Sequence, residues 1–244
     1  MAGSLSLVAA GGSRAAEIPA SGSDHPQDGR LPSRPSGLGE PWQVPAPPSP
    51  TLSELFATSP RDAGWTGFLL AQADRSKPVL WVQDRMAIVE SGRIYPPGLG
   101  CGELIHVEAR DAKLALWAME EGLRCSGLSG VIGELWGDPA ALGFTATRRL
   151  AVAAERSRVP CWLVRLAATA NLSGARMRWR IASMPSIANP FDPRAPGSPA
   201  WEAELFRARG HQPGRWGVAH EADTFHLAAA PGRGTLVEVE RIRA

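Results

Sequence analysis

Hydrophobic residues along this chain form short runs, separated by stretches with helical spacing. Apolar runs cover residues 104–107, 131–136 and 160–165. The segments between them, residues 111–125 and 145–158, carry apolar side chains at intervals of three or four. Strands that alternate with helices of this length are typical of β-α-β units. The pattern therefore predicts an α/β fold in which helices cover a mainly parallel sheet.

Two further strands are predicted upstream of this region. Residues 52–57 fit a short strand, although they also fit one helical turn, and residues 66–73 fit a short helix. Residues 79–83 form a continuous apolar run that suits a strand buried on both faces. Residues 86–100 are predicted to hold one short helix and a turn rich in Pro and Gly.

Downstream of residue 165 the helical spacing stops and alternation begins. Residues 177–181 alternate apolar side chains with arginine, which predicts a half-exposed strand. Residues 201–209 and 216–219 flank a Gly-containing segment and read as a hairpin, and residues 224–227 add one more strand. Residues 185–200 are rich in Pro and are predicted to be a loop. The sheet is therefore expected to end in antiparallel strands.

Composition divides the chain into three parts. Residues 1–50 contain 16 Gly or Pro and little that could fill a core, which predicts a disordered tail. Residues 51–230 are the expected folded domain. Residues 231–244 form a C-terminal tail that could add as an edge strand, either internally or to a partner.

The three cysteines, Cys101, Cys125 and Cys161, are widely spaced and include no C-x-x-C pair. They fit reduced thiols and a cytoplasmic location better than a disulfide framework or a zinc site. No apolar run approaches the roughly 18 residues of a membrane span, and the first residues lack the pattern of a signal peptide. The net charge of +2 is too small to indicate nucleic-acid binding by itself.

The loop after the first strand lies where a nucleotide-binding sheet carries its phosphate loop, G-x-x-x-x-G-K-[ST]. In the matching window Gly64 and Thr66 agree with this motif, but Ser59 replaces the first glycine and Trp65 replaces the lysine. An indole supplies no positive charge for phosphate. An ordinary strand–helix turn explains the window equally well.

Neither a metal site nor a serine nucleophile is indicated. His220 and His226, with Glu221 and Asp223, match no metal-ligand spacing. On one strand the two histidines would lie about 20 Å apart, which indicates polar surface. The chain also has no G-x-S-x-G segment to support a serine nucleophile.

Arginine and tryptophan recur in the C-terminal part. A strand over residues 177–181 puts its arginines on one side, which fits a solvated face, a single-stranded nucleic-acid surface or a protein contact. The candidate interaction surface comprises Arg176, Arg178, Trp179, Arg180, Trp201, Arg207, Arg209 and Trp216.

Nine segments, in this order and spacing, resemble the RecA superfamily and more closely the ImuA family of bacterial mutagenesis accessory proteins. The resemblance covers about residues 51–230 and depends on the combination, since no single motif is diagnostic. The segments are LSELF (52–56), TGFL (66–69), LWVQD (80–84), DAKLALWAMEEGLR (111–124), VIGEL (131–135), TRRL (147–150), MRWRI (177–181), DPRAPG (192–197) and WEAEL (201–205).

The resemblance implies a RecA-like sheet with altered functional positions. The phosphate-binding lysine of RecA falls on Trp65, its catalytic glutamate near Arg85, and its metal-supporting aspartate on Glu134. Without the lysine and the base, nothing neutralises phosphate charge or positions an attacking water. The expectation is a pseudo-ATPase without enzymatic activity, bound cofactor or metal.

ImuA-like proteins accompany a catalytically dead relative of Y-family polymerases and an error-prone replicative-type polymerase in SOS-induced translesion synthesis. The resemblance therefore implies an adaptor in the response to DNA damage that contacts an ImuB-type partner and RecA. The alternatives are a SulA-like cell-division inhibitor, a RecA-like ATPase with a non-standard loop, and a direct binder of single-stranded DNA.

Overall fold

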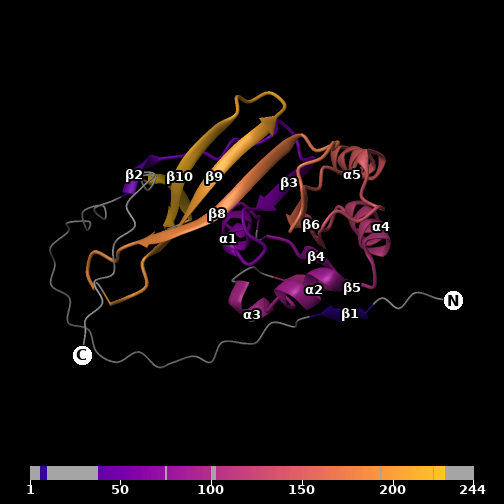
Figure 1. Ribbon diagram of the computed structural model, residues 1–244, viewed down its shortest axis with the longest axis horizontal. Coiled ribbons are helices and arrows are strands. Elements are labelled where there is room, and N and C mark those ends of the chain that lie inside the picture. Colours follow the sequence, from indigo (N-terminus) through magenta and orange to yellow (C-terminus); the bar gives the residue numbers. More distant parts are fainter. Residues whose placement is uncertain are drawn as a thin grey trace.

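The computed structural model describes residues 6–9, 38–74, 76–99, 103–192, 194–221 and 223–228. Its centre is one long twisted sheet, and helices pack on both faces of the half shown on the right of Figure 1. The described strands form an 11-stranded sheet. Across the sheet they follow the order β1 (Ser6–Ala9), β5 (Leu104–Ala109), β4 (Val79–Asp84), β6 (Gly130–Trp136), β7 (Cys161–Leu166), β3 (Leu52–Ala57), β8 (Met177–Ile187), β9 (Ser198–Ala208), β10 (Gly214–Glu221), β11 (Thr224–Ala228) and β2 (Leu38–Pro41).

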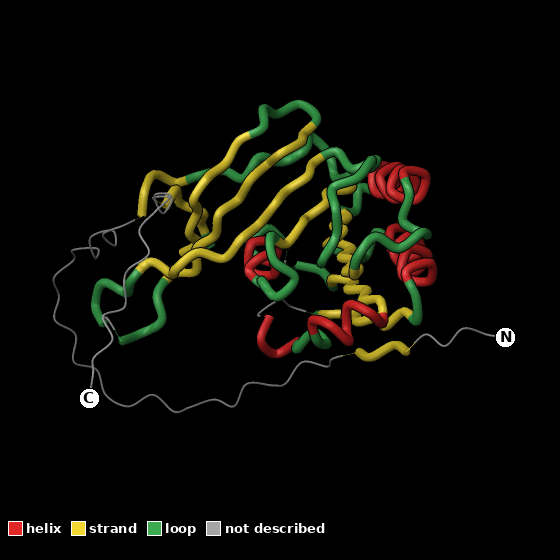
Figure 2. The backbone as a smooth tube through the Cα atoms, in the orientation of Figure 1, coloured by secondary structure: helices red, strands yellow, loops and turns green. Residues whose placement is uncertain are grey.

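The six central strands from β5 to β8 run parallel to one another. From β8 onward, each neighbouring pair of strands is antiparallel. Figure 2 shows this second half as long strands that no helix covers on the side facing the viewer. The predicted architecture, a mainly parallel sheet that ends in antiparallel strands, is confirmed.

Five helices connect the parallel strands: α1 (Gly64–Leu70), α2 (Arg85–Ser91), α3 (Pro96–Leu99), α4 (Ala112–Leu123) and α5 (Phe144–Ser157). Helices α4 and α5 cover one face of the sheet, and α1 packs on the opposite face. Asp111 caps the start of α4, because its Oδ1 accepts a hydrogen bond from the Leu114 amide at 2.9 Å.

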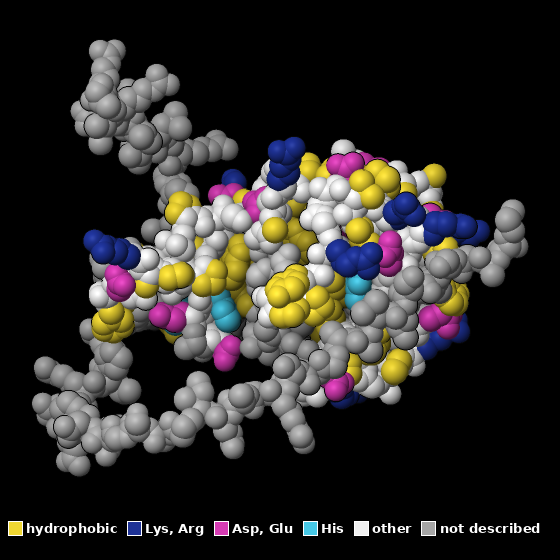
Figure 3. Space-filling model, turned by 90° about the horizontal axis from the view of Figure 1, so that it is seen from below, with side chains coloured by type: hydrophobic (Ala, Val, Ile, Leu, Met, Phe, Trp, Pro, Cys, Tyr) yellow, Lys and Arg dark blue, Asp and Glu magenta, His cyan; other side chains and the backbone are white. Residues whose placement is uncertain are grey.

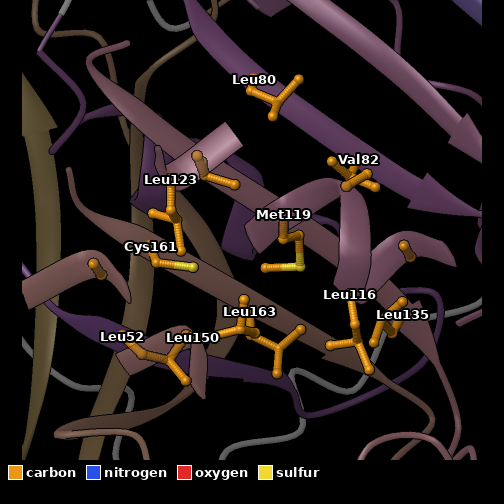
Figure 4. Packing of buried hydrophobic residues seen from close by; sticks show 14 of the residues in the cluster. Leu52, Leu80, Val82, Leu116, Met119, Leu123, Leu135, Leu150, Cys161 and Leu163 are labelled. Carbon is orange, nitrogen blue, oxygen red and sulfur yellow. The ribbon is translucent and has the colours of Figure 1, made fainter. Parts of the chain in front are cut away.

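The core under α4 and α5 is aliphatic. Figure 4 shows Met119 of α4 among leucine and valine side chains from the sheet and from both helices. Gly133 of β6 makes room for it, since a Cβ there would overlap the Met119 thioether. Met119 is fully buried, whereas Trp117 of the same helix is 49% exposed, although both are apolar residues of the segment with helical spacing.

The core on the α1 face is aromatic. Phe68 of α1 lies 5.6 Å from Trp179 and 6.1 Å from Trp201, measured between ring centroids. Its ring also lies 5.6 Å from that of Phe225. Helix α1 follows a parallel strand and packs on antiparallel ones, so this cluster joins the two halves of the sheet.

Upstream of Thr51, the sequence prediction placed the domain boundary too late. Strand β2 pairs with β11, and the Trp42 amide donates a hydrogen bond to the Phe225 carbonyl at 2.8 Å. The Trp42 ring packs 5.3 Å from the Trp216 ring. A tryptophan that can bury its ring stabilises an otherwise Pro-rich segment, which composition alone does not reveal. Residues 1–5, 10–37 and 229–244, and Cys101, lie outside the described residues.

Several element boundaries also differ from the predictions. Helix α1 begins at Gly64 rather than at residue 66, and the turn near residue 96 contains the short helix α3. The Pro-rich segment 185–200 was predicted to be a loop, yet β8 extends to Ile187 and β9 begins at Ser198. Pairing between these strands is irregular there, which accommodates proline.

Across the part of the chain that the structure describes, no helix combines the length and apolarity needed to cross a membrane.

The contact between α4 and β6 gives a first testable prediction. Replacing Gly133 with alanine should lower the free energy of unfolding by about 1–3 kcal/mol, because the added methyl group displaces Met119 from a filled core. Gly127→Ala is the matched control, since its methyl group would meet only ordinary contact with Cys125, and its effect should stay within about 0.5 kcal/mol. Chemical denaturation of both variants measures the difference, and equal effects would contradict this account of the core.

Candidate functional site: the closed nucleotide edge and its flanking charges

The loop between β3 and α1 is held shut by one of its own side chains. Asp62 Oδ1 accepts hydrogen bonds from the Gly64 amide at 2.9 Å and from Ser183 Oγ at 2.5 Å, and Oδ2 accepts one from the Ser183 amide at 2.8 Å. Burial raises the pKa of Asp62, but these hydrogen bonds outweigh burial and hold the pKa below its usual range. The Asp62 carboxylate thus satisfies a loop amide and ties the loop to β8.

Trp65, which stands at the position of the phosphate-binding lysine, points into the aromatic core. Its side chain is 5% exposed, and its ring centroid lies 6.0 Å from that of Trp81 in β4. Of the other residues in the window, Ser59 is exposed and Thr66 is half-buried. The window has an exposed cation in Arg61, but at the lysine position it presents an indole, and its Asp62 carboxylate occupies a loop amide that an anion would need.

Arg85, which stands near the position of the catalytic glutamate, is the first residue of α2 and is exposed. The preceding residue, Asp84, caps this helix by accepting a hydrogen bond from the Ala87 amide at 2.6 Å. Burial raises the pKa of Asp84. No carboxylate occupies the aligned position, and the neighbouring one already serves as a helix cap.

Glu134 on β6 is 3% exposed and fully engaged by hydrogen bonds. Its Oε2 accepts from Gln83 Nε2 at 2.9 Å and Trp81 Nε1 at 3.3 Å, and its Oε1 accepts from Ser91 Oγ at 3.0 Å. Burial raises the pKa of Glu134 even though these hydrogen bonds act in the opposite direction. Gln83 Oε1 in turn lies 3.0 Å from Nε2 of His106, so the network continues into β5.

An open hollow of about 500 Å³ remains at this edge of the sheet. Its lining includes two cations, Arg61 and Arg93, and three acids, Asp62, Glu90 and Glu134. Arg93 Nη2 is bound to a Glu108 carboxylate oxygen at 2.6 Å. The charges along the hollow thus do not add up to a positive surface for a triphosphate.

Three members of the predicted interaction surface are buried and cannot form a surface. Trp179 is 1% exposed and Trp201 4% exposed, both in the aromatic core. Arg178 is 3% exposed and lies against Glu54 and the Phe56 ring. The alternation of apolar residues with arginine correctly put the arginines of β8 on one face of the sheet. The alternation does not show which parts of that face other elements cover.

The other five members lie at three separate places, because Trp216 packs on the face of the aromatic core whereas Arg180 lies on the opposite face of the sheet. Trp216 is half-buried against Trp42, and Arg180 pairs with Glu204 at 3.2 Å over the Phe206 ring. Arg176, Arg207 and Arg209 lie together at the opposite end of β8 and β9, where they line a second hollow. The predicted surface is therefore not one continuous patch.

A buried group of charges was missed by the sequence analysis. Glu54 of β3, with no exposed surface, lies between Arg178 of β8, at 2.7 Å, and Arg165 of β7, at 3.8 Å. Arg165 also pairs with Asp138, and Ser173 Oγ donates to Glu54 at 2.7 Å. Burial lowers the pKa of Arg165, while Glu54 and Asp138 oppose that effect. The sequence did carry a signal for this buried group, since each of three apolar strands that are adjacent in the sheet contains a charged residue.

The guanidinium groups of this buried group are not fully satisfied. Arg165 Nε and Nη1, and Arg178 Nη2, have no hydrogen-bond partner. The Phe56 ring lies between the two groups, 5.4 Å from Arg165 and 5.3 Å from Arg178. Its π face supplies part of the compensation that hydrogen bonds do not provide.

His220 and His226 are not on one strand, as the sequence argument assumed. A tight turn places His220 on β10 and His226 on the paired strand β11, in neighbouring register positions. The His220 ring contacts Phe225 edge-on, with centroids 5.1 Å apart. Among the described residues, no group of three or more His, Cys, Asp or Glu side chains is arranged to hold a metal ion.

The strand arrangement defines an α/β protein, and its loop between β3 and α1 is filled by the side chains of the chain itself. No protein-family model matches the chain. The chain is similar to Protein ImuA of Caulobacter vibrioides strain NA1000 / CB15N and to Protein ImuA of strain ATCC 19089 / CIP 103742 / CB 15. In each case 32% of residues are identical over 150 residues.

The aligned region covers 57% of this chain and 58% of each relative. The chain therefore spans less than two thirds of the length of the curated relatives it matches. The similarity confirms the resemblance that the nine sequence segments predicted, and it supports membership of the ImuA family.

The buried charges give a second prediction. Glu54→Gln should lower the free energy of unfolding by about 3–5 kcal/mol, because two buried guanidinium groups lose their shared counter-charge. Glu204→Gln breaks the partly exposed pair with Arg180 and should cost at most about 1 kcal/mol. Urea denaturation near neutral pH compares the two, and a Glu54 effect as small as that of Glu204 would refute the role assigned to the cluster.

A third prediction follows from the raised pKa of Glu134. Since the folded state favours the protonated carboxyl, its contribution to stability is present below the unfolded pKa and is lost as pH rises through the folded pKa. Stability of the wild type relative to Glu134→Gln should therefore fall as pH rises above the usual pKa range of a glutamate. Denaturation curves of both proteins from this range upward test it, and a difference that does not change with pH contradicts it.

Proposed function

We propose that this protein is a non-catalytic RecA-like adaptor in damage-induced, error-prone translesion synthesis. The similarity to proteins named ImuA supports a role in this mutagenesis pathway. The observation that carries the non-catalytic part is the occupied phosphate loop, in which Trp65 is buried and Asp62 binds the loop amide. A body of this shape could contact proteins that recognise RecA-like surfaces, but it has no means to cycle with ATP.

We further propose that it acts through contacts with an ImuB-type, Y-family polymerase-like protein and with RecA, and that it assists an error-prone replicative-type polymerase. Exposed apolar side chains near the closed edge support action by protein contact. Met86 and Val89 of α2 are 50% and 65% exposed, and Tyr95 is 69% exposed. Figure 3 shows hydrophobic side chains gathered near the middle of the face that carries α2 and α3. Such surfaces commonly mark interaction sites.

The test is a pull-down from DNA-damaged cells with the full chain as bait, followed by thermal unfolding of the same protein with Mg-ATP. The polymerase-like partner and RecA should be captured. The melting temperature should not move, whereas a site with a Kd of about 10 μM would add about 2.7 kcal/mol at about 1 mM ATP. A nucleotide-dependent shift would support the ATPase alternative, and capture of the division tubulin instead would support the SulA-like one.

A further inference from the structure

A hollow of about 490 Å³ lies where the start of α5 meets the first residues of β8 and the last residues of β9. In Figure 1 these three elements converge at the upper right of the sheet. Four arginines line the hollow, and none of its lining residues is acidic. They are Arg148, Arg176, Arg207 and Arg209, and we refer to this hollow as the basic pocket.

Most of the charge in the basic pocket is not neutralised locally. Arg176 binds Glu155 at 2.8 Å, but Arg148, Arg207 and Arg209 are exposed and make no ion pair with any described residue. Arg207 also stands opposite Arg178 in the β8–β9 register, which places like charges side by side. Free guanidinium groups that converge on one hollow create a positive potential that attracts an anion.

The positive surface continues beyond the pocket along α5. A groove between α4 and α5 is lined by Arg124, Arg149 and Arg156, and it shares Arg148 with the basic pocket. From Arg148 to Arg156 the helix rises about 12 Å, so the arginines form a track rather than a point. A track of this kind fits a ligand that carries charges at intervals.

The excess of charge on this track is larger than that of the whole protein. Of its seven arginines, three form ion pairs with Glu120, Glu121 and Glu155. Arg209 lies near enough to Glu155 to help lower the pKa of that carboxyl, and the other three arginines form no ion pair with a described carboxylate. The complete chain has a formal net charge of only +2. The basic character is therefore concentrated here and does not reflect a generally basic composition.

One aromatic ring lies at the mouth of the basic pocket. Phe144, the first residue of α5, lines the pocket and is 43% exposed. The rest of the lining is small, with Ser173, Gly174 and Ala175 on one wall and Ala208 on the other. The hollow thus combines cations with one available ring face and offers no deep apolar slot for a peptide side chain.

The pocket is held in shape by the packing of its wall against α5. Gly174 passes so close to α5 that an added Cβ would lie 2.7 Å from the backbone of Arg148. The Gly174 amide also donates a hydrogen bond to Thr147 Oγ1 at 2.9 Å. The backbone at Arg148 and at the Gly174 wall is therefore held in place before a ligand arrives, which reduces the entropy lost on binding.

We propose that the basic pocket and the track along α5 bind single-stranded nucleic acid, with phosphates on the arginines and an unpaired base stacked on Phe144. Phosphate contacts combined with base–aromatic stacking are how proteins bind single strands without sequence preference. A paired base cannot turn its face to the ring, so a single strand is favoured over a duplex. This inference is separate from the adaptor function, because binding of an oligonucleotide requires neither RecA nor a polymerase.

The test is fluorescence anisotropy of a labelled oligothymidylate of about 20 nucleotides with the full chain, over a series of salt concentrations. Arg207→Ala/Arg209→Ala should weaken binding about tenfold at low salt. In a plot of log K against log salt concentration, the slope should become shallower by about 1.4, which is about 0.7 for each arginine–phosphate contact that the variant removes. Phe144→Ala should weaken binding about tenfold and leave the salt dependence unchanged.

The matched control is Arg85→Ala/Arg194→Ala, which removes the same charge at two exposed positions away from the pocket. It should bind like the wild type, and all variants should keep the wild-type melting temperature. Competition by an unlabelled duplex of the same length and by a glutamate-rich peptide of equal charge should be weak. The inference is overturned if the oligonucleotide does not bind at low salt, if the control loses as much affinity as the pocket variant, or if duplex or peptide competes as well as the single strand.

Discussion

The two halves of this sheet are joined by the carboxylate of Glu54. Its strand, β3, has a parallel strand on each side, and the carboxylate contacts Arg165 on one of them and Arg178 on the other. The Arg178 partner is 124 residues away in sequence. Through this contact the helix-covered half is held against the strands that begin the antiparallel half. Removing one member of such a cluster leaves buried charge uncompensated, so the three side chains depend on one another.

At the edge of the sheet where β3 ends, three side chains of the predicted nucleotide positions serve packing and hydrogen bonding. Trp65 fills space in the aromatic core, Asp62 fastens its loop to β8, and Glu134 joins three hydrogen-bond donors. Each of these polar or aromatic groups is thus satisfied within the folded chain. The contacts stabilise the edge and at the same time leave little free hydrogen-bonding capacity there.

Local sequence signals predicted the elements but not the long-range pairs. Apolar runs and helical spacing located the parallel strands and α4. The Pro- and Gly-rich composition of residues 1–50 predicted a disordered tail, yet the ring of Trp42 packs against Trp216, 174 residues later. The bond between Asp62 and Ser183 spans 121 residues, and no periodicity within either segment reports it. The basic pocket likewise gathers Arg148, Arg176 and Arg207 from segments that only the folded chain brings together.

Strand β2 occupies one end of the described sheet, and its pairing with β11 carries a consequence for how the protein is handled. A chain cut at Thr51, where composition suggests the boundary, would lose β2 and Trp42 together. The backbone groups of β11 that β2 satisfies would then face water as an open strand edge beside Trp216 and Phe225. An open edge next to aromatic surface recruits other chains. Self-association of a shortened protein would report the position of that cut rather than a natural oligomer.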